Sequence, residues 1–287
     1  MSIRSIVPWQ LKIIVKLILS RLPFSYQQWS KVGLFRHGEM DSLDYAWGVL
    51  NRHIKQMLSE REGWCGLELG PGDGILSALL APALGATGLS LLDSGDYADK
   101  ETNNYLRQIK IFSEKHHHYS LPDYFNCITI DELLQTSGAV YYSNGLTSLR
   151  ALEDNSLDII YSQAVLEHVR RDEFYETMSH CRRLLKNNGV MSHVIDFKDH
   201  LGGALNNLRI PSSLWEKDWF ASKSNFYTNR LRLSEIIKIS ENSGFVVDVV
   251  EVNRYKTVPI QKKQLAREFS GLSDNDLLIS EAHLVMR

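Results

Sequence analysis

Cysteine is scarce in this chain, and its spacing excludes several kinds of site. The 287 residues contain three cysteines, Cys65, Cys127 and Cys181, which lie far apart and form no CxxC pair. An odd number at such spacing is typical neither of a disulfide framework nor of a zinc or redox motif. We therefore expect reduced thiols and a cytoplasmic location, with Cys65 buried at the start of a core strand.

The chain also has little net charge and no internal repeat. Its formal net charge is -2, and 23% of its residues are charged. Such a balance gives no overall field that would attract a polyanion, so nucleic acid is not an expected partner. The length fits one large α/β domain with added segments as well as it fits two domains, and we expect one core.

No apolar run is long enough to span a membrane. The strongest one, residues 9–22, is interrupted by Lys12 and Lys16, lacks a small-residue cleavage site and ends before Pro23. On a helix, Lys12, Lys16 and Ser20 share one face, which makes the segment amphipathic. Three partners stay open for its apolar face: the chain's own domain, a second subunit in a homo-oligomer, or an anionic membrane that the protein contacts peripherally.

From residue 64 onward, short apolar segments alternate with helical patterns. This alternation predicts an α/β fold with a mostly parallel sheet that helices cover on both faces. The expected strands are 64–69, 88–92, 139–142, 157–161, 190–195, 245–255 and 279–286, and the main expected helices are 41–61, 75–84, 101–115, 130–135, 172–186 and 231–243.

Two segments lie outside this alternation. Residues 1–60 are expected to form an N-terminal helical extension or cap, and residues 61–287 the main domain. Residues 197–230 carry aromatic and polar groups with little periodicity, which indicates an insertion after the fifth strand. Such an insertion could form a lid over a substrate.

A glycine-rich loop, residues 70–74, lies between the first strand and the following helix. Glycines there let the backbone turn sharply and approach a ligand closely. The spacing is not GxGxxG, because Ile75 follows the third glycine, and Pro71 removes an amide donor that a pyrophosphate would use. Glu68 adds negative charge before the loop, so a cationic ligand fits better than NAD.

Asp93 closes the second expected strand about 20 residues after the glycines. At that offset an acidic side chain can accept hydrogen bonds from both ribose hydroxyls of a nucleoside cofactor. The loop and Asp93 together therefore predict a nucleoside site.

Residues 67–74, read Leu-Glu-Leu-Gly-Pro-Gly-Asp-Gly, resemble the first motif of the class I, Rossmann-like S-adenosylmethionine-dependent methyltransferases. The likeness covers about residues 60–200, includes residues 152–169 and 184–190, and continues in the last two strands. It implies a doubly wound, seven-stranded sheet with an antiparallel C-terminal strand. It also implies that Glu68, Gly70, Pro71 and Gly72 hold the methionine part of the cofactor, that Asp93 holds the ribose, and that Ser162 and Gln163 border it.

One position departs from this family pattern. Many relatives carry an aspartate after a glycine near position 146, where it binds the adenine amino group, but this chain has Gly145-Leu146. We expect backbone groups or Asn144 to take that role.

The acceptor side is suggested by a looser likeness. Residues 35–41, 195–200 and 224–232 resemble segments of little-characterised methyltransferases associated with natural-product or surface-glycan assembly. This resemblance implies a small-molecule or glycan acceptor, either free or lipid-linked. A hydroxyl acceptor would need a general base, and histidine is the side chain that titrates nearest neutrality.

His200 is the first candidate for that base, with Asp196 close by, because both follow the fifth strand at the edge where open α/β sheets bind ligands. His37 is the second candidate, since its glycine-containing segment could fold over the site. For His168, a packing role is a better explanation than a catalytic one. No metal is expected, because a strand would place His193 and Asp196 on opposite faces.

Tyr227, Asn229 and Arg230 are candidate acceptor-binding residues, with Arg230 a natural clamp for a carboxylate, a phosphate or a sugar. The competing interpretation of Arg230 is an ordinary surface ion pair. Two other functions also stay open for the whole chain. The same fold could transfer a different group, such as aminopropyl, or it could serve as a catalytically silent partner in an assembly.

Overall fold

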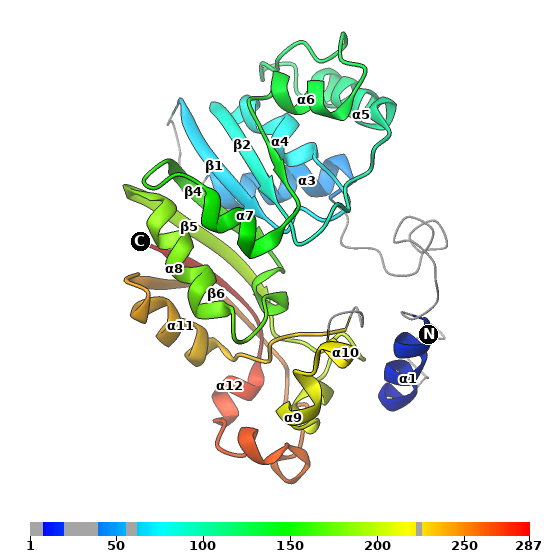
Figure 1. Ribbon diagram of the computed structural model, residues 1–287, viewed down its shortest axis with the longest axis vertical. Helices are drawn as coiled ribbons and strands as arrows, with labels where there is room; N and C mark the ends of the chain where they lie inside the picture. The colour runs from blue at the N-terminus through cyan, green and yellow to red at the C-terminus, as the bar shows by residue number, and fades with distance from the viewer. Residues whose placement is uncertain (1–7, 20–39, 56–61, 222–225) are drawn as a thin grey trace.

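A computed structural model describes residues 8–19, 40–55, 62–221 and 226–287. Seven strands form one sheet in the order β3-β2-β1-β4-β5-β7-β6, in which β7 is antiparallel to both β5 and β6 (Figure 1). The other pairs are parallel. This confirms the predicted doubly wound sheet. The strands are β1 (Trp64–Leu69), β2 (Ala86–Leu92), β3 (Tyr141–Tyr142), β4 (Leu157–Gln163), β5 (Leu185–Asp196), β6 (Val247–Arg254) and β7 (Ile279–Met286).

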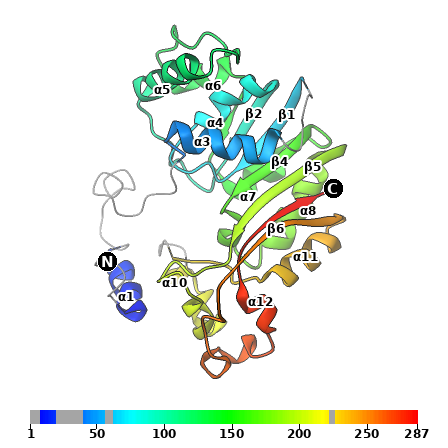
Figure 2. The same ribbon diagram turned by 180° about the vertical axis from the view of Figure 1, so that it is seen from behind.

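Helices cover both faces of the sheet, as Figures 1 and 2 show for α3 on one side and α7 and α8 on the other. Adjacent residues of a strand point to opposite faces. Ile159 therefore packs with the first set of helices and Ile160 with the second. The first set is α3 (Leu43–Leu50), α4 (Leu76–Leu80), α5 (Thr102–Lys115) and α6 (Ile130–Thr136), and the second is α7 (Gly145–Ala151), α8 (Phe174–Leu184) and α11 (Leu233–Asn242).

Several elements differ from their expected bounds for local reasons. The helix expected over 75–84 is α4 followed by a 3-10 turn, Ala81–Leu84, because Pro82 has no backbone N–H to continue an α-helix. The helix expected over 41–61 is α3 followed by a π-helical turn, Asn51–Lys55. No helix is expected between residues 142 and 157, but α7 lies there.

The insertion after β5 folds into short helices, and a second insertion packs against it. Residues 197–230 contain a 3-10 turn (Asn206–Arg209), α9 (Ser212–Trp215) and α10 (Asp218–Ala221). Residues 255–278, which the sequence did not mark as an insertion, include α12 (Asp274–Leu278) and join β6 to β7. Leu205 and Leu208 share an apolar cluster with Phe269. The two insertions thus form one helical unit beyond the end of β5 (Figure 1).

The amphipathic helix α1 (Trp9–Leu19) packs on this unit through Ile13, which is buried against Leu201 and Phe226. The chain's own domain is therefore a partner of one face of α1. Another face exposes the side chains of Leu11, Ile14, Val15 and Ile18, each to between 43% and 57%. Within the described ranges, no helix is both long and apolar enough to cross a bilayer.

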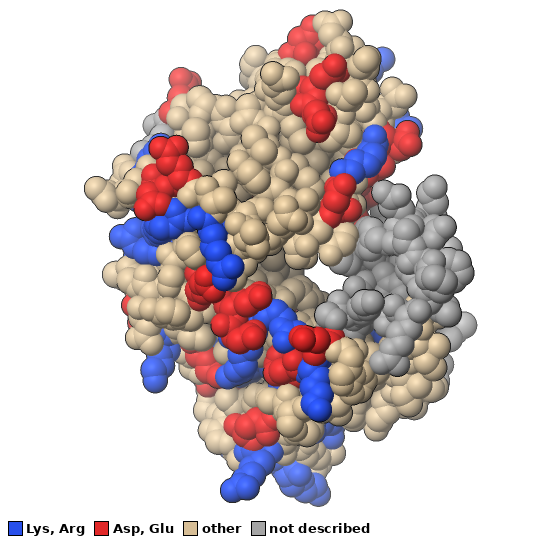
Figure 3. Space-filling model, viewed as in Figure 1, with Lys and Arg blue, Asp and Glu red and all other residues tan. Residues whose placement is uncertain are grey.

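Acidic and basic side chains lie side by side over much of the face shown in Figure 3. The mixture agrees with the small net charge of the sequence. On this face neither sign forms a broad patch.

Candidate active site

The glycine-rich loop lies at the carboxyl end of β1, between the ends of β2 and β4, which pair with β1 on its two sides. Open α/β sheets bind ligands at such a point. Gly70 has φ +65°, and a Cβ added there would lie 2.5 Å from a side-chain carbon of Val165. The loop therefore needs glycine at this position to turn and to pack against the segment after β4.

Asp93 follows β2 and lies directly beside the loop. One of its carboxylate oxygens accepts a hydrogen bond from the Gly72 N–H at 3.1 Å, and the other accepts one from the Ser94 N–H at 2.7 Å. The loop and the acid that the sequence paired across about 20 residues are thus brought together. They form one polar corner at the carboxyl edge of the sheet.

Glu68 lies beneath this corner, buried in β1. Ser77 of α4 donates a short hydrogen bond to its carboxylate. Burial raises the pKa of Glu68 to about 7, and Asp93 adds to the rise. Near pH 7 the Glu68 carboxyl is therefore divided between its charged and neutral forms, and Asp93 supplies more of the negative charge than the sequence alone suggests.

Ser162 and Gln163 end β4 and point to opposite faces of the sheet. The Ser162 hydroxyl lies 2.7 Å from Nδ1 of buried His193. Gln163 Oε1 lies 3.3 Å from Nε2 of His53. Both side chains therefore contact histidines: Ser162 contacts His193 in β5, and Gln163 contacts His53 in the π-helical turn.

His53 belongs to a buried polar chain that the sequence did not reveal. Its Nδ1 lies 2.8 Å from the Ser192 hydroxyl, and that hydroxyl lies 2.8 Å from Nε2 of His283. Burial lowers the pKa of His53 to about 3, and His283 lowers it further. This series of hydrogen bonds joins the π-helical turn, β5 and β7, so neutral imidazoles hold together the strands behind the site.

The segment after β3 reaches the same corner. The Gly145 N–H donates to the Asp93 carbonyl oxygen at 2.8 Å, while Leu146 packs with the α8 side of the core. A pocket opens nearby between β3 and α6, and its lining includes Asp96, Tyr141 and Ser143. Backbone groups after β3 are therefore within reach of the cofactor corner.

On the other side of the loop, a 3-10 turn (Leu166–His168) follows Val165. Glu167 in this turn is buried; one of its carboxylate oxygens accepts from the Asp196 N–H at 3.3 Å, and the other, Oε2, is buried without a hydrogen-bond partner. Burial raises the pKa of Glu167 well above its ordinary value. His168 is exposed, and its Nδ1 donates to the Tyr227 carbonyl oxygen at 2.8 Å.

His200 lies beside this turn, with its ring centroid 4.8 Å from that of His168. Its loop is held by Asp199, whose carboxylate accepts hydrogen bonds from the N–H groups of Leu201, Gly202, Ala204 and Asn206. Burial lowers the pKa of His200 to about 4, and the nearby Lys16 ammonium contributes. The imidazole is therefore neutral at pH 7 and can accept a proton.

Asp196 and His37 are two further candidates for the proton-transfer machinery. The Asp196 carboxylate accepts a hydrogen bond from the Lys198 N–H at 2.8 Å and forms an ion pair with the Lys198 ammonium at 3.0 Å. His37 lies outside the described residues.

Comparison with known proteins now adds to this geometry. Residues 134–192 match a family described as a methyltransferase domain. This match agrees with the class of S-adenosylmethionine-dependent methyltransferases that the sequence resembles. The match and the confirmed sheet support this class, and with it the cofactor that the sequence predicts. No curated protein sequence matches the chain.

Several solved structures with similar folds are distant in sequence. Phosphoethanolamine N-methyltransferase 2 of Haemonchus contortus is 16% identical, with 84% of this chain and 52% of that chain covered and a TM-score of 0.46. A methyltransferase of Mesorhizobium loti is 17% identical, with 86% of this chain and 100% of that chain covered and a TM-score of 0.46. A methyltransferase of Archaeoglobus fulgidus is 13% identical, with 85% of this chain and 94% of that chain covered and a TM-score of 0.45. The chain spans about half the length of the first of these proteins.

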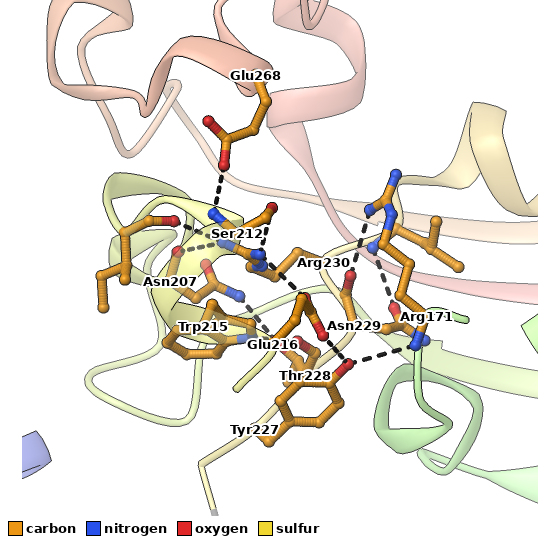
Figure 4. A network of polar contacts seen from close by, with 12 residues as sticks. Arg171, Asn207, Ser212, Trp215, Glu216, Tyr227, Thr228, Asn229, Arg230 and Glu268 are labelled. Atoms are coloured by element: carbon orange, nitrogen blue, oxygen red, sulfur yellow. Dashed lines mark hydrogen bonds and ion pairs between the residues drawn. The ribbon is translucent and has the colours of Figure 1, made fainter. Parts of the chain in front are cut away.

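Tyr227, Asn229 and Arg230 line the junction between the insertion and the turn after β4 (Figure 4). Asn229 donates through its amide to the carbonyl oxygens of Leu166 and Val169, at 2.8 and 2.9 Å. The Tyr227 hydroxyl donates to Glu216 at 2.7 Å. These contacts fix the insertion against the turn that carries His168.

Arg230 is almost fully buried and has φ +61°. Its guanidinium donates to the Ile210 carbonyl oxygen at 2.6 Å and to the Ser212 hydroxyl at 2.8 Å, and it pairs with Glu216 at 3.0 Å. Arg230 thus has an anionic partner inside the insertion. Its contacts are those of a buried ion pair, which neither of the sequence-based interpretations described.

Proposed function

We propose that this methyltransferase transfers a methyl group to a hydroxyl oxygen of a small-molecule or glycan acceptor, free or lipid-linked. The observation that carries the proposal is the neutral imidazole of His200 beside His168, next to the corner formed by the loop at Gly70 and Asp93. Val165 connects the two, since it packs on Gly70 and accepts from the His168 N–H. A proton acceptor thus lies near the place where the cofactor binds.

The cofactor would be held as the sequence suggests. Asp93 accepts from the ribose hydroxyls, and the backbone of Gly70, Pro71 and Gly72 follows the methionine part. Glu68 supports the loop from below. Backbone groups after β3 and Asn144 contact the adenine, with Ser162 and Gln163 at the border.

The reaction is an in-line displacement. The acceptor oxygen forms a bond to the methyl carbon while the carbon–sulfur bond of the sulfonium breaks, which leaves S-adenosylhomocysteine. The hydroxyl proton passes to a ring nitrogen of His200; Asp196 and His37 are further candidates for this role. Because charge is cancelled as the methyl moves, most of the acceleration comes from holding the three centres in line in a dry site.

The acceptor would lie under the insertion of residues 197–230. Tyr227, Asn229 and Arg230 shape this wall, Asn229 through its bonds to the turn and Arg230 through its ion pair with Glu216. In this arrangement Arg230 does not contact the acceptor, and it affects acceptor binding by holding the wall in place.

The exposed face of α1 supports peripheral contact with an anionic membrane, where a lipid-linked acceptor would be found. Leu11, Ile14, Val15 and Ile18 form a stripe at helical spacing, and α1 contains lysines and no acidic residue. Insertion of this stripe would leave Ile13 packed on the domain.

The test is a mass-spectrometric screen for acceptors with hydroxyl groups, incubated with S-adenosylmethionine and the purified protein. The expected result is the gain of one methyl group on oxygen in at least one glycan or small-molecule acceptor, abolished by Asp93→Ala. Methylation found only on nitrogen, sulfur or carbon would contradict the hydroxyl acceptor. Methylation that persists in Asp93→Ala would contradict the proposed cofactor corner.

A further inference from the structure

The carboxylate of Glu167 and the imidazoles of His168 and His200 converge at the acceptor side of the site. One ligand atom from each residue lies within 4.8 Å of the others. The residues come from the turn after β4 and the loop after β5, so the fold of the sheet brings them together. Two histidines and one carboxylate are a donor set that first-row divalent metals accept.

A purely structural role of Glu167 does not explain the surroundings of its Oε2 atom. The residue is 3% exposed, and this oxygen has no hydrogen-bond partner, while its other oxygen accepts from the Asp196 N–H. A buried carboxylate oxygen without a partner is costly, because nothing replaces the water it has lost. A bound cation beside it would supply the missing interaction.

His168 is oriented in the way that metal-binding histidines usually are. Its Nδ1 donates to the Tyr227 carbonyl oxygen, which can only accept, so the neutral ring keeps its lone pair on Nε2. Metal-binding histidines commonly donate the other ring N–H to a backbone carbonyl, which fixes the tautomer and the ring orientation.

We propose that Glu167, His168 and His200 bind one divalent transition-metal ion, with zinc as the representative ion. Bonds to zinc of about 2.0–2.2 Å require ligand atoms closer together than the observed limit, so the cluster must contract by roughly 1 Å on binding. Lys16 and Lys198 nearby oppose a cation, and Asp196 and Asp199 favour one.

The ion would have a role in the proposed hydroxyl methylation, and this part of the inference rests on that function. Catalytic zinc sites commonly have three protein ligands and an open fourth position. An acceptor hydroxyl in that position would have a lowered pKa, since a bound cation stabilises the oxyanion. With the ion bound, His200 would serve as a ligand in place of its role as the proton acceptor, and the hydroxyl proton would leave to solvent before the methyl is transferred.

The test is a titration of the full-length, tag-free protein with Co²⁺ as a spectroscopic probe for zinc, without cofactor or acceptor. His117→Ala plus His118→Ala is the background, because the surface histidines 116–118 could bind an ion of their own. The expected result is one Co²⁺ per chain with the visible absorption of a tetrahedral site, displaced by Zn²⁺. His168→Ala and His200→Ala should each weaken binding at least about tenfold, and Glu167→Gln should do the same if it folds, as judged by circular dichroism.

His180→Ala, on the surface of α8, is the matched control and should leave binding unchanged. Absence of Co²⁺ binding in the background protein, or binding retained in both His168→Ala and His200→Ala, would overturn the proposal. Because the titration contains no cofactor or acceptor, neither result tests the proposed methylation. That function is tested separately by the mass-spectrometric screen.

Discussion

The imidazole rings of His168 and His200 lie 4.8 Å apart, although one follows β4 and the other follows β5. Each ring is fixed by contacts of its own segment: His168 by the Tyr227 carbonyl oxygen, His200 by the loop that Asp199 organises. The pair therefore occupies a defined position at the carboxyl edge of the sheet.

Replacing His200 with alanine should reduce turnover much more than cofactor affinity. In the proposed site the ring lies on the acceptor side, so its loss would remove a proton acceptor or metal ligand and would leave Asp93 and the glycine loop in place. We expect a fall in kcat of about 10²–10⁴, with the Kd for S-adenosylhomocysteine within about twofold. His117→Ala, in the exposed histidine tract, serves as the control. Unchanged turnover in His200→Ala would move the base to His37.

Buried His53 should make the protein less stable in acid. Its pKa is about 3 in the folded protein, against about 6.5 in an unfolded chain. Between these values the unfolded state binds the extra proton, so the stability is complete above pH 6.5 and is lost as the pH falls towards 3. His53→Gln should reduce the slope of the unfolding free energy between pH 6 and 4 by about 1.4 kcal/mol per unit. An unchanged slope in denaturant titrations would refute this.

Glu68 should have the opposite pH dependence. Its pKa is raised to about 7, so the folded state holds a proton that the unfolded state has released, and stability falls as the pH rises from about 4.5 through 7. Glu68→Gln keeps a group that accepts from Ser77. We expect the variant to be more stable than the wild type at pH 8 and no more stable at pH 4.5, measured by thermal unfolding. Equal differences at both pH values would contradict a buried, titrating carboxyl.

The ion pair between Arg230 and Glu216 should hold the insertion together. Glu216→Ala would leave a buried guanidinium without its anion, at a cost of about 3 kcal/mol in unfolding free energy. Glu241→Ala, an exposed residue on α11, should change the unfolding free energy by less than about 0.5 kcal/mol. Similar small effects in both variants would show that Arg230 does not depend on this pair.

The exposed stripe of α1 should drive vesicle binding. Ile14→Ser plus Ile18→Ser removes apolar surface from the stripe while Ile13 and Lys16 keep their contacts with the insertion. Cosedimentation with anionic vesicles should fall in this variant and in high salt. Binding that is unaffected by these substitutions would contradict membrane contact, and a change in oligomeric state would assign the stripe to a second subunit.

Much of the fold could be predicted because its signals are local. The strands are short apolar segments between turns, and β7 begins and ends where the pattern predicted. Gly70 and Asp93 could be paired because the βαβ unit fixes the spacing between them. The residues 255–278 lack such periodicity, and their burial depends on contacts with the first insertion that no local pattern encodes.

The acceptor side was harder to predict for the same reason. His168 stood in a pattern that suggested packing, yet the structure exposes its ring beside His200. The buried chain of His53, Ser192 and His283 joins three distant segments. Arg230 pairs within the insertion because α9 brings Glu216 back onto it, a tertiary contact that spacing alone does not specify.

The measurement that tests the central claim most directly is calorimetric titration of the protein with S-adenosylmethionine and S-adenosylhomocysteine, compared with Asp93→Ala. A site formed by the loop at Gly70 and Asp93 predicts one molecule bound per chain, with affinity at least about tenfold weaker in the variant, since it loses hydrogen bonds to a charged acceptor worth about 1.5–3 kcal/mol each. No binding of either compound, or equal affinity in wild type and Asp93→Ala, would contradict it.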